Sequence, residues 1–279
     1  MNILIFGGNR YFGKEIVKKL ILKNNCLYLV NRGNLKNVQS KKIKLIKLDR
    51  NKITTKNNIF KNIIFDVVLD NSSYDVKSVK KVFKLLDKNM KHYIYTSSIL
   101  SYMNLSYKNF VDEKSWYKKK NTKNMRKNYN EGIIRYGLKK EKAEKFIINQ
   151  KSISYTILRP HTVIGKDDFS LRTKNFLNFN FKLLNFNKKQ FIQFCYKEDL
   201  IQIIMKLIYK RKKNSNVYNV CNDAISIADT SKILKNSGKN KFGFPLPIDA
   251  LMSNRKICKS LNFKFKNSLH VIRKLKENN

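Results

Sequence analysis

The architecture is set near the start of the chain by Ile3-Leu4-Ile5-Phe6-Gly7-Gly8-Asn9-Arg10-Tyr11-Phe12-Gly13. An apolar run leads into three closely spaced glycines, and apolar residues then recur at helical spacing between Glu15 and Leu22. The order strand, tight turn, helix is the context of a dinucleotide fingerprint. Glycine lets the backbone approach a pyrophosphate, and the helix start supplies free N–H groups and a positive dipole. An ordinary strand-to-helix turn is the alternative.

Strand and helix patterns alternate through the first half of the chain. Strands are predicted at Leu27–Val30, Ile43–Leu48, Ile64–Leu69 and His92–Thr96, and a helix at Val76–Leu86. Short buried strands alternating with amphipathic helices predict an α/β fold with a Rossmann-type, doubly wound parallel sheet, covered on both faces. Its ligand is expected at the carboxyl ends of the strands.

The second half has a weaker pattern. Residues 103 to 130 are interpreted as a solvated loop. A helix is predicted from Tyr136 to Ile148, a strand at Tyr155–Leu158 stopped by Arg159-Pro160, a helix at Leu200–Tyr209, a strand at Val217–Cys221, and then a mixed tail with Pro245 and Pro247. We therefore expect a dinucleotide-binding domain over 1–165, with return segments near 190–222, and a small C-terminal α/β lobe on the substrate side over 166–279.

Composition excludes several classes of protein. The chain has 279 residues, of which 42% are apolar, too many for a disordered polycation. No apolar run reaches the ~18 residues that span a bilayer, and the first strand is too short for a signal-peptide core, so we expect a cytoplasmic protein without membrane partners. Cys26, Cys195, Cys221 and Cys258 stand singly and are interpreted as reduced core residues rather than metal ligands.

The net charge of +41, from 60 basic and 19 acidic residues, has two interpretations. Such an excess favours nucleic acid or an anionic membrane. However, it is spread over the whole chain together with abundant Asn, Ile, Phe and Tyr, which are the residues of AT-rich codons. Genome bias acts at every position, whereas a binding patch should be local.

The ends of the next strands suggest which dinucleotide would bind. NAD sites place a carboxylate after the second strand to hold the ribose hydroxyls, whereas this chain has Asn31 and Arg32. Arg10 and Arg32 could converge on a 2′-phosphate, so NADP(H) is favoured over NAD(H). Asp49 and Arg50, after the third strand, either border the adenine or form a solvated turn. The predicted cofactor residues are Gly7, Gly8, Asn9, Arg10, Tyr11, Phe12, Gly13, Asn31, Arg32, Asp49, Arg50, Asn71, Lys140, Pro160 and His161.

Acid–base chemistry is suggested by Tyr136 and Lys140. At i and i+4 these side chains share one face of a helix, and a nearby ammonium favours the phenolate, which makes the tyrosine a usable proton donor and acceptor. A Lys-rich chain also produces this spacing by chance. The functional interpretation of this pair is strengthened by Ser97 and Ser98 at the end of the fifth strand, where substrate is expected. Serines in this position also cap helices and form turns, which is the alternative.

Together these residues resemble the extended and atypical short-chain dehydrogenase/reductases, of the NAD-dependent epimerase/dehydratase type. The resemblance rests on Gly7-Gly8-x4-Gly13, Ser97-Ser98-x3-Tyr102, Tyr136-x3-Lys140, Leu158-Arg159-Pro160…Ile164-Gly165, Gln193-Phe-Cys-Tyr-Lys-Glu-Asp199 and Val217-Tyr-Asn-Val220. It implies that Ser98 orients substrate, Tyr136 is the acid/base, and Lys140 holds the nicotinamide ribose and tunes Tyr136. The segment after Pro160 would border the nicotinamide. His161 replaces a usual small residue and is expected to be a packed histidine rather than a proton carrier.

Within that family, the loop and Asn31-Arg32-Gly33 look most like the chloroplast stem-loop-binding-protein group, which includes proteins that handle RNA. Arg10 replaces the usual middle glycine, and Ile99 and Leu100 replace the Asp-Glu pair of sugar 4,6-dehydratases, which disfavours a dehydratase. The family often dimerises, so the resemblance implies a homodimer.

Two hypotheses therefore stand. The first is an NAD(P)-dependent oxidoreductase or epimerase that transfers hydride to or from a carbinol or ketone carbon of a small-molecule substrate. The second is an RNA-binding protein on the same fold, which would use Lys118-Lys119-Lys120, Lys210-Arg211-Lys212-Lys213, Trp116, Tyr117 and Tyr209.

Overall fold

The computed structural model describes residues 1–33, 38–52, 60–86, 88–102, 110–117, 131–179, 191–210, 214–234 and 251–277. The chain divides into two compact units. The first comprises Met1–Asn104, Asn121–Arg159 and Ile204–Val217, and the second comprises Leu105–Lys120, Pro160–Ile203 and Tyr218–Asn279. Residues 204–217, within the expected return segment, thus belong to the first unit. No helix among the described ranges is long and apolar enough to cross a membrane.

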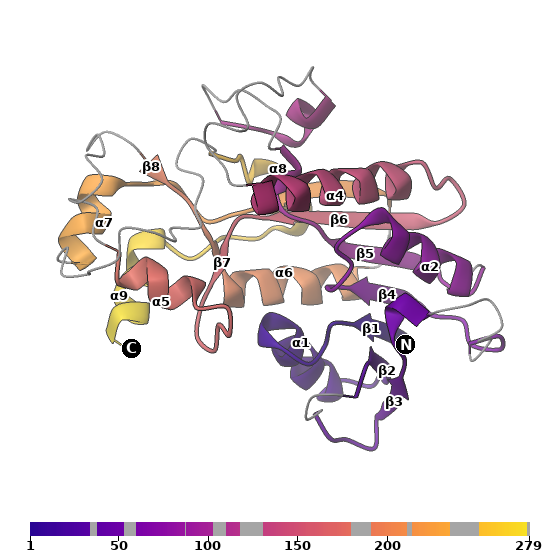
Figure 1. The fold of residues 1–279 in the computed structure, drawn as a ribbon. Helices are drawn as coiled ribbons and strands as arrows, with labels where there is room; N and C mark the ends of the chain where they lie inside the picture. The colour runs from indigo at the N-terminus through magenta and orange to yellow at the C-terminus, as the bar shows by residue number, and fades with distance from the viewer. Residues whose placement is uncertain are drawn as a thin grey trace. The chain divides into compact units, whose positions relative to one another are not determined.

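A seven-stranded sheet organises the chain, in the order β10-β6-β5-β4-β1-β2-β3 (Figure 1). Its strands are β1 (Asn2–Phe6), β2 (Cys26–Asn31), β3 (Ile43–Lys47), β4 (Val67–Asp70), β5 (His92–Thr96), β6 (Ser154–Pro160) and β10 (Asn216–Val220). The pairings from β3 through β6 are all parallel. The order reverses between β1 and β4, which confirms the doubly wound topology and makes the carboxyl edge beside β1 the expected ligand site.

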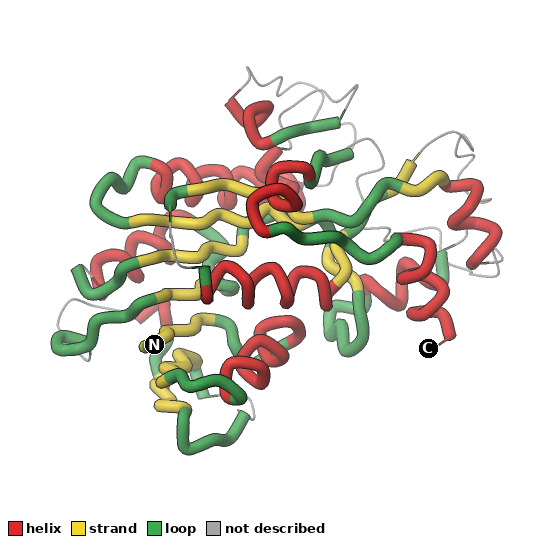
Figure 2. Tube along the Cα trace, turned by 180° about the vertical axis from the view of Figure 1, so that it is seen from behind, coloured by secondary structure: helices red, strands yellow, loops and turns green. Residues whose placement is uncertain are grey.

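Helices connect these strands, as the 3.6-residue periodicity predicts. They are α1 (Tyr11–Ile21), α2 (Val76–Leu86), α4 (Glu131–Ile148) and α6 (Lys197–Tyr209), with short 3-10 turns η1 (Arg50–Lys52) and η2 (Ile99–Tyr102). Figure 2 shows how they alternate with the strands along the chain. The helix predicted at Val76–Leu86 has the observed bounds, whereas α4 begins five residues before Tyr136 and α1 begins at Tyr11, so that Tyr11, Phe12 and Gly13 form its first turn.

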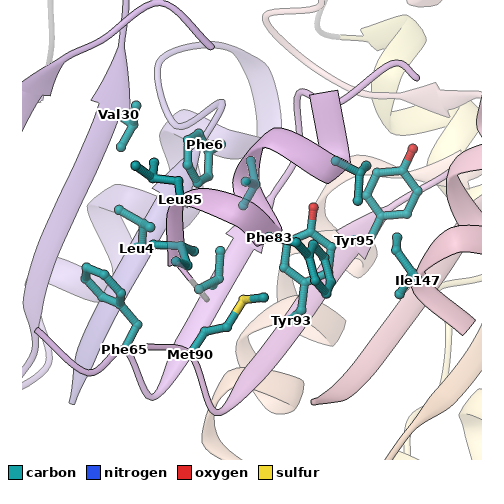
Figure 3. Packing of buried hydrophobic residues seen from close by; sticks show 14 of the residues in the cluster. Leu4, Phe6, Val30, Phe65, Phe83, Leu85, Met90, Tyr93, Tyr95 and Ile147 are labelled. Carbon is teal, nitrogen blue, oxygen red and sulfur yellow. The ribbon is translucent and has the colours of Figure 1, made fainter. Parts of the chain in front are cut away.

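Alternating side chains of the central strands fill the core of the first unit. Leu4 and Phe6 of β1 pack in one cluster with Phe83 of α2 and Ile147 of α4 (Figure 3). Ile5 points the other way, because successive strand residues face opposite sides of a sheet. Helix α2 also packs against α4, with the Phe83 and Phe146 rings 5.3 Å apart between centroids. The sheet therefore fixes α4, the helix that carries Tyr136 and Lys140.

Three strand predictions need correction. The strand expected at Ile64–Leu69 begins at Val67, and Ile64 is 55% exposed. The strand β3 is an edge strand rather than a buried one, with Leu45 half exposed, because it has a neighbour on one side only. Arg159 and Pro160 do not lie beyond the end of β6, because they are its last two residues. A proline is tolerated at the last position of a strand, where little of the hydrogen-bond ladder remains to be made.

The second unit contains short strands and helices. They are η3 (Glu113–Tyr117), β7 (Val163–Ile164), α5 (Arg172–Leu177), β8 (Phe191–Ile192), β9 (Cys195–Tyr196), β11 (Ile225–Ser226), α7 (Ile227–Leu234), α8 (Arg255–Leu261) and α9 (Ser268–Glu277). Its own apolar cluster includes Phe176, Phe194 and Ile272. Residues 110–117 were expected in a solvated loop, but Val111 and Trp116 are buried, and Val111 forms a β-bridge with Met252. The tail prolines, Pro245 and Pro247, lie outside the described residues.

Candidate active site

The glycine-rich loop joins β1 to α1 under tight steric limits. Gly7 has φ +82°, a conformation that favours glycine. A Cβ on Gly13 would lie 2.1 Å from the Gly7 carbonyl oxygen, so the backbone of the loop packs directly against the backbone of the first turn of α1. A Cβ on Gly8 would lie 2.5 Å from Leu29 of β2 and 2.8 Å from Val17 of α1. Each glycine is therefore required by the close approach of strand, loop and helix.

Arg10, the departure from the usual glycine pattern, fits this loop without backbone strain. It is the N-cap of α1, with φ −131° and ψ 152°, an extended conformation that any residue adopts. The left-handed conformation falls instead on Tyr11, at φ 48°. The Tyr11 ring is buried and meets Phe12 edge to face, with ring centroids 5.9 Å apart. Arg10 itself is exposed, so its guanidinium lies at the surface beside the loop.

The end of β2 lies beside the loop, because Phe6 pairs with Val30 in parallel register. The Asn31 side-chain oxygen accepts a hydrogen bond of 2.7 Å from the Gly33 N–H, which shapes the turn. Gly33 has φ +84°, and Arg32 between them is exposed. Neither residue 31 nor residue 32 supplies a carboxylate. Arg10 and Arg32 are both exposed, and their convergence on a 2′-phosphate stays a prediction.

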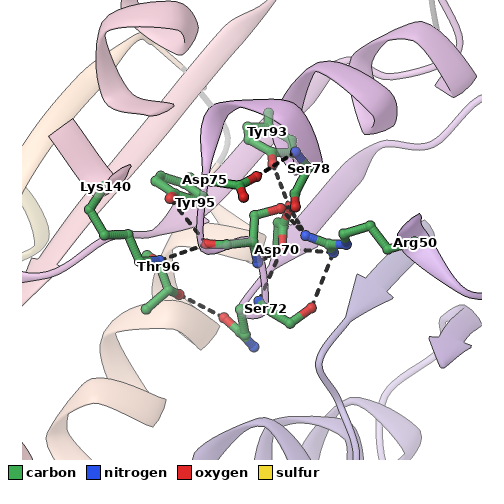
Figure 4. A network of polar contacts seen from close by, with 11 residues as sticks. Arg50, Asp70, Ser72, Asp75, Ser78, Tyr93, Tyr95, Thr96 and Lys140 are labelled. Atoms are coloured by element: carbon green, nitrogen blue, oxygen red, sulfur yellow. Dashed lines mark hydrogen bonds and ion pairs between the residues drawn. The ribbon is translucent and has the colours of Figure 1, made fainter. Parts of the chain in front are cut away.

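Arg50 and the buried Asp70 form an ion pair at the same edge, in which the Arg50 side chain is 13% exposed (Figure 4). Nη2 of Arg50 lies 3.0 Å from Oδ1 of Asp70, and Nη1 lies 3.1 Å from Oδ2. Asp70 is completely buried and also accepts hydrogen bonds from the Ser73 N–H, the Ser73 hydroxyl and the Tyr93 hydroxyl. Burial alone would raise the pKa of Asp70, but the Arg50 charge and these bonds outweigh it and hold the pKa below its usual value. Arg50, expected beside the adenine, is thus bound to a carboxylate.

Asn71 follows Asp70 and lies against the glycine loop. Its N–H donates to the Phe6 carbonyl at 3.0 Å, and its Oδ1 accepts from the Thr96 hydroxyl at 2.7 Å. A Cβ on Gly7 would come within 3.2 Å of the Asn71 Cβ. The Asn71 side-chain nitrogen is buried and has no hydrogen-bond partner among the described residues. Buried donors are normally paired, so this nitrogen suits a ligand that supplies an acceptor.

Lys140 is buried at the carboxyl edge, between β4 and β5. Its ammonium donates to the carbonyl oxygens of Ser73 and Thr96, both at 2.8 Å. It also lies 4.7 Å from the Tyr95 ring centroid and 5.8 Å from that of Tyr136. Burial lowers the pKa of Lys140 to about 8, although nearby carboxylates oppose the effect. The structure thus brings together the predicted tyrosine and lysine, with the ammonium under the aromatic ring.

Tyr136 is partly exposed, one turn before Lys140 on the same helix. Its ring meets Tyr74 edge to face, with centroids 6.0 Å apart, and Tyr74 is 63% exposed. Tyr136, which is predicted to exchange a proton, is therefore partly accessible to solvent, whereas Lys140 is buried.

Ser98 and Ser97 have different partners. The Ser98 hydroxyl, predicted to orient substrate, accepts a hydrogen bond of 3.2 Å from the Leu100 N–H and so makes the turn expected as the alternative. The Ser97 hydroxyl donates to the buried carboxylate of Glu144 in α4. Glu144 also binds Arg159, whose Nε and Nη2 lie 2.9 and 2.6 Å from Oε2. Glu144 therefore connects α4 to Ser97, the residue after β5, and to Arg159 of β6.

Pro160 and His161 belong to the second unit. Pro160 is the buried last residue of β6, and the N–H of His161 donates to the Val220 carbonyl at 3.0 Å. The His161 ring is 1% exposed, and its Nδ1 accepts from the Thr162 N–H at 2.8 Å.

The four cysteines are free thiols. Cys195 and Cys221 are buried, while Cys26 and Cys258 are half-buried.

Residues named for RNA binding are only partly described. Lys118-Lys119-Lys120 and Arg211-Lys212-Lys213 lie outside the described residues. Trp116 is 5% exposed, which leaves little of its ring face for stacking on a base. Tyr209 is 40% exposed, and its hydroxyl accepts a hydrogen bond from the Asn25 side chain at 2.6 Å.

Asp70, Ser73 and Glu144 were missed by sequence reasoning. Each one contacts partners far along the chain, such as Arg50, 20 residues before Asp70. One sequence signal could have indicated the role of Asp70. It directly follows the apolar run Val67-Val68-Leu69, and a carboxylate at the end of a buried strand needs a partner.

The doubly wound sheet and the glycine loop after its first strand place the chain in the Rossmann-like, dinucleotide-binding class of folds. A model of the NAD dependent epimerase/dehydratase family matches residues 3–221, so the chain belongs to that family. No protein with a curated description matches the sequence.

Solved structures with the same fold include MoeE5 in complex with UDP-glucuronic acid and NAD, at 15% identity and TM-score 0.71, covering 100% of this chain and 99% of that one. The dTDP-glucose 4,6-dehydratase of Bacillus anthracis in complex with NAD has 14% identity and TM-score 0.73, covering 99% and 96%. WbmG of Bordetella bronchiseptica in complex with NAD and UDP has 14% identity and TM-score 0.73, covering 99% and 92%.

Proposed function

We propose that this protein is an NAD(P)-dependent oxidoreductase or epimerase in which Tyr136 is the acid/base. The proposal rests on one observation above all: the Lys140 ammonium lies buried at the carboxyl edge, between the carbonyls of Ser73 and Thr96 and beneath the Tyr136 ring. A positive charge there stabilises the phenolate of Tyr136 and makes the phenol a better proton donor.

The residues at the edge fit a dinucleotide. Gly7 and Gly13 allow the tight turn between β1 and α1 that any Cβ at residue 13 would prevent, and this turn places the start of α1, with its first N–H groups, beside the loop. The unpartnered nitrogen of Asn71 supplies a buried donor beside the loop. A bound nicotinamide would supply the hydride chemistry. Tyr136 would then give or take the hydroxyl proton of the substrate at its phenolic oxygen, and Ser98 would orient that hydroxyl.

NADP(H) is the cofactor that the side chains favour. Arg10 and Arg32 are exposed near the loop, and residues 31 and 32 carry no carboxylate. The three structural relatives named above hold NAD, which makes NAD(H) the competing choice. The same Arg10 and the Asn31-Arg32-Gly33 turn support the proposed likeness to the chloroplast stem-loop-binding-protein group.

A small sugar-like alcohol or ketone is the proposed substrate class, and UDP-glucose and UDP-glucuronic acid, which relatives bind, are the first compounds to screen. Ile99 and Leu100 at the start of η2 offer no carboxylate for elimination, so we propose epimerisation or reduction rather than dehydration. The RNA-binding alternative is weakened, because Trp116 is buried.

Calorimetric titration with NADPH and NADH at moderate salt, beside Arg32→Ala, tests the cofactor site. We expect NADPH to bind, and its preference over NADH to be lost in the variant. Absence of binding by both cofactors would refute the proposal and favour the RNA hypothesis.

Tyr136→Phe then tests the chemistry. With a substrate from the screen, we expect turnover to fall by ~10²–10⁴ with cofactor affinity unchanged. Full turnover in a variant that still binds cofactor would remove Tyr136 from the acid/base role.

A further inference from the structure

A continuous chain of polar contacts runs from the partly buried Arg50 to the buried Lys140 within the first unit (Figure 4). Arg50 binds Asp70, and Asp70 accepts from both the N–H and the hydroxyl of Ser73, at 2.9 and 2.5 Å. The carbonyl of that same Ser73 accepts the Lys140 ammonium at 2.8 Å. Arg50 follows β3, Asp70 ends β4, and Lys140 lies on α4. The contacts thus connect three elements across the carboxyl edge.

Ser73 is the residue through which Asp70 can act on Lys140. Its backbone N–H and its hydroxyl both donate to Asp70, and the hydroxyl oxygen also accepts from Nη1 of Arg50, so the peptide units on either side have little freedom. Its carbonyl accepts from the Tyr95 hydroxyl at 3.2 Å as well as from Lys140. Because Ser73 is wholly buried, water cannot replace these contacts. The position of one of the two carbonyls that hold the ammonium is therefore fixed by the Asp70 carboxylate.

We propose that Asp70 is a positioning residue for Lys140, acting through Ser73 to hold the ammonium under Tyr136. This inference rests on the proposed function, in which Lys140 assists Tyr136. Asp70 acts indirectly on Lys140 and Tyr136: its role is to fix the carbonyl that holds the ammonium and to supply a compensating negative charge. Arg50 in turn keeps Asp70 ionised and immobile, so a residue next to the predicted adenine position supports the catalytic pair.

Other charged and titratable groups also face Lys140. Glu144, one turn further along α4, and Asp70 favour the ammonium, whereas Arg50 opposes it. The phenols of Tyr95, Tyr136 and Tyr74 present their rings at 4.7, 5.8 and 5.8 Å from Nζ. Because Glu144 is occupied by Arg159 and Ser97, Asp70 is the carboxylate whose hydrogen bonds lead directly to the cradle.

The test follows the Lys140 ammonium itself by nitrogen-15 NMR of the full chain, with the signal assigned by its loss in Lys140→Arg. In the wild type we expect a slowly exchanging ammonium with a pKa of about 8. Asp70→Asn should lower that pKa further and speed exchange with water, since a neighbouring opposite charge is removed. Asp66→Asn is the matched control, because Asp66 precedes the same strand and pairs with Lys91 at the surface.

An unchanged Lys140 pKa and exchange rate in folded Asp70→Asn would overturn the proposal, since a purely structural role moves stability alone. If Asp70→Asn does not fold, Ser73→Ala keeps both charges and removes only the hydroxyl with its contacts to Asp70 and Arg50. Exchange of the Lys140 ammonium should then be about tenfold faster, and an unchanged rate would again overturn the proposal. The NMR measurement needs no cofactor, so its failure is distinguishable from absence of NADPH and NADH binding, which refutes the proposed function.

Discussion

Glu144 and Arg159 form an ion pair in which both side chains are fully buried, with Nη2 of Arg159 2.6 Å from Oε2 of Glu144. Arg159 Nη1 also donates to the Tyr102 hydroxyl at 2.7 Å, and the Arg159 guanidinium lies over the Tyr102 ring. Glu144 stands one turn after Lys140 on α4. The pair therefore determines how the helix with the proposed catalytic residues rests on β6.

Breaking this pair should destabilise the protein strongly. Glu144→Gln leaves the Arg159 charge buried without its partner, and we expect a loss of about 3–5 kcal/mol in the free energy of unfolding. Glu144→Leu combined with Arg159→Met should recover much of that loss, because no lone charge remains. Urea denaturation measures both. Glu15→Gln, at the exposed pair with Lys18, is the control and should change stability by about 1 kcal/mol at most.

Gly13→Ala should abolish cofactor binding. The new Cβ would lie 2.1 Å from the Gly7 carbonyl oxygen, so the loop must move away from the helix start that is proposed to hold the pyrophosphate. Calorimetry with NADPH measures the loss. Gly132→Ala is the matched change on an exposed residue of α4, and it should retain affinity and raise stability by about 0.5–1 kcal/mol. Retained affinity in Gly13→Ala would contradict the placement of the cofactor.

Most of the first unit was predictable from sequence, because its signals are local. Each strand is a short apolar run, and each helix has apolar residues at 3.6-residue spacing, so β1, α1, β2, α2, β5 and α4 follow from neighbours in the chain. The edge strand β3 was placed correctly, but its exposure was not, because burial depends on how many neighbours a strand has. The start of α4 before Tyr136 was missed, since Lys- and Asn-rich segments lack apolar periodicity.

The site was predictable where one segment carries the chemistry. The glycine loop and the i, i+4 pair of Tyr136 and Lys140 are such segments. The contacts that support the site were not predictable, because they join residues that are distant in sequence. Lys140, for example, contacts Ser73, which lies 67 residues earlier in the chain. The role of Arg50 illustrates this limit, since a basic residue after β3 suggested a ligand, whereas a carboxylate from β4 holds it.

Asn71→Asp should distinguish the role of the Asn71 side-chain nitrogen from that of its oxygen. An aspartate keeps an oxygen for the Thr96 hydroxyl but replaces the buried, unpartnered nitrogen with an acceptor. We expect NADPH and NADH to bind about tenfold more weakly, or about 1.4 kcal/mol, because a donor to the cofactor is lost and a negative charge is added. Thr96→Val is the complementary control, which removes the internal bond and leaves the nitrogen. Equal affinity in Asn71→Asp would show that this nitrogen does not contact cofactor.

The buried Lys140 should make stability depend on alkaline pH. Burial lowers its pKa to about 8 in the folded protein, against ~10.4 in an unfolded chain. Between these values the unfolded state binds a proton that the native state has released, so the free energy of unfolding rises with pH. The contribution is complete above the unfolded pKa and is lost as the pH falls through about 8.

We therefore expect the difference in free energy of unfolding between the wild type and Lys140→Met to increase in favour of the wild type from about pH 7 to about pH 10. Urea denaturation across that range measures it, and other titrating groups cancel in the difference. Lys139→Met, at the exposed neighbouring position of the same helix, should give a nearly flat difference. A flat curve for Lys140→Met as well would mean that Lys140 keeps its proton when buried, and Asp70 and Glu144 would then outweigh its desolvation.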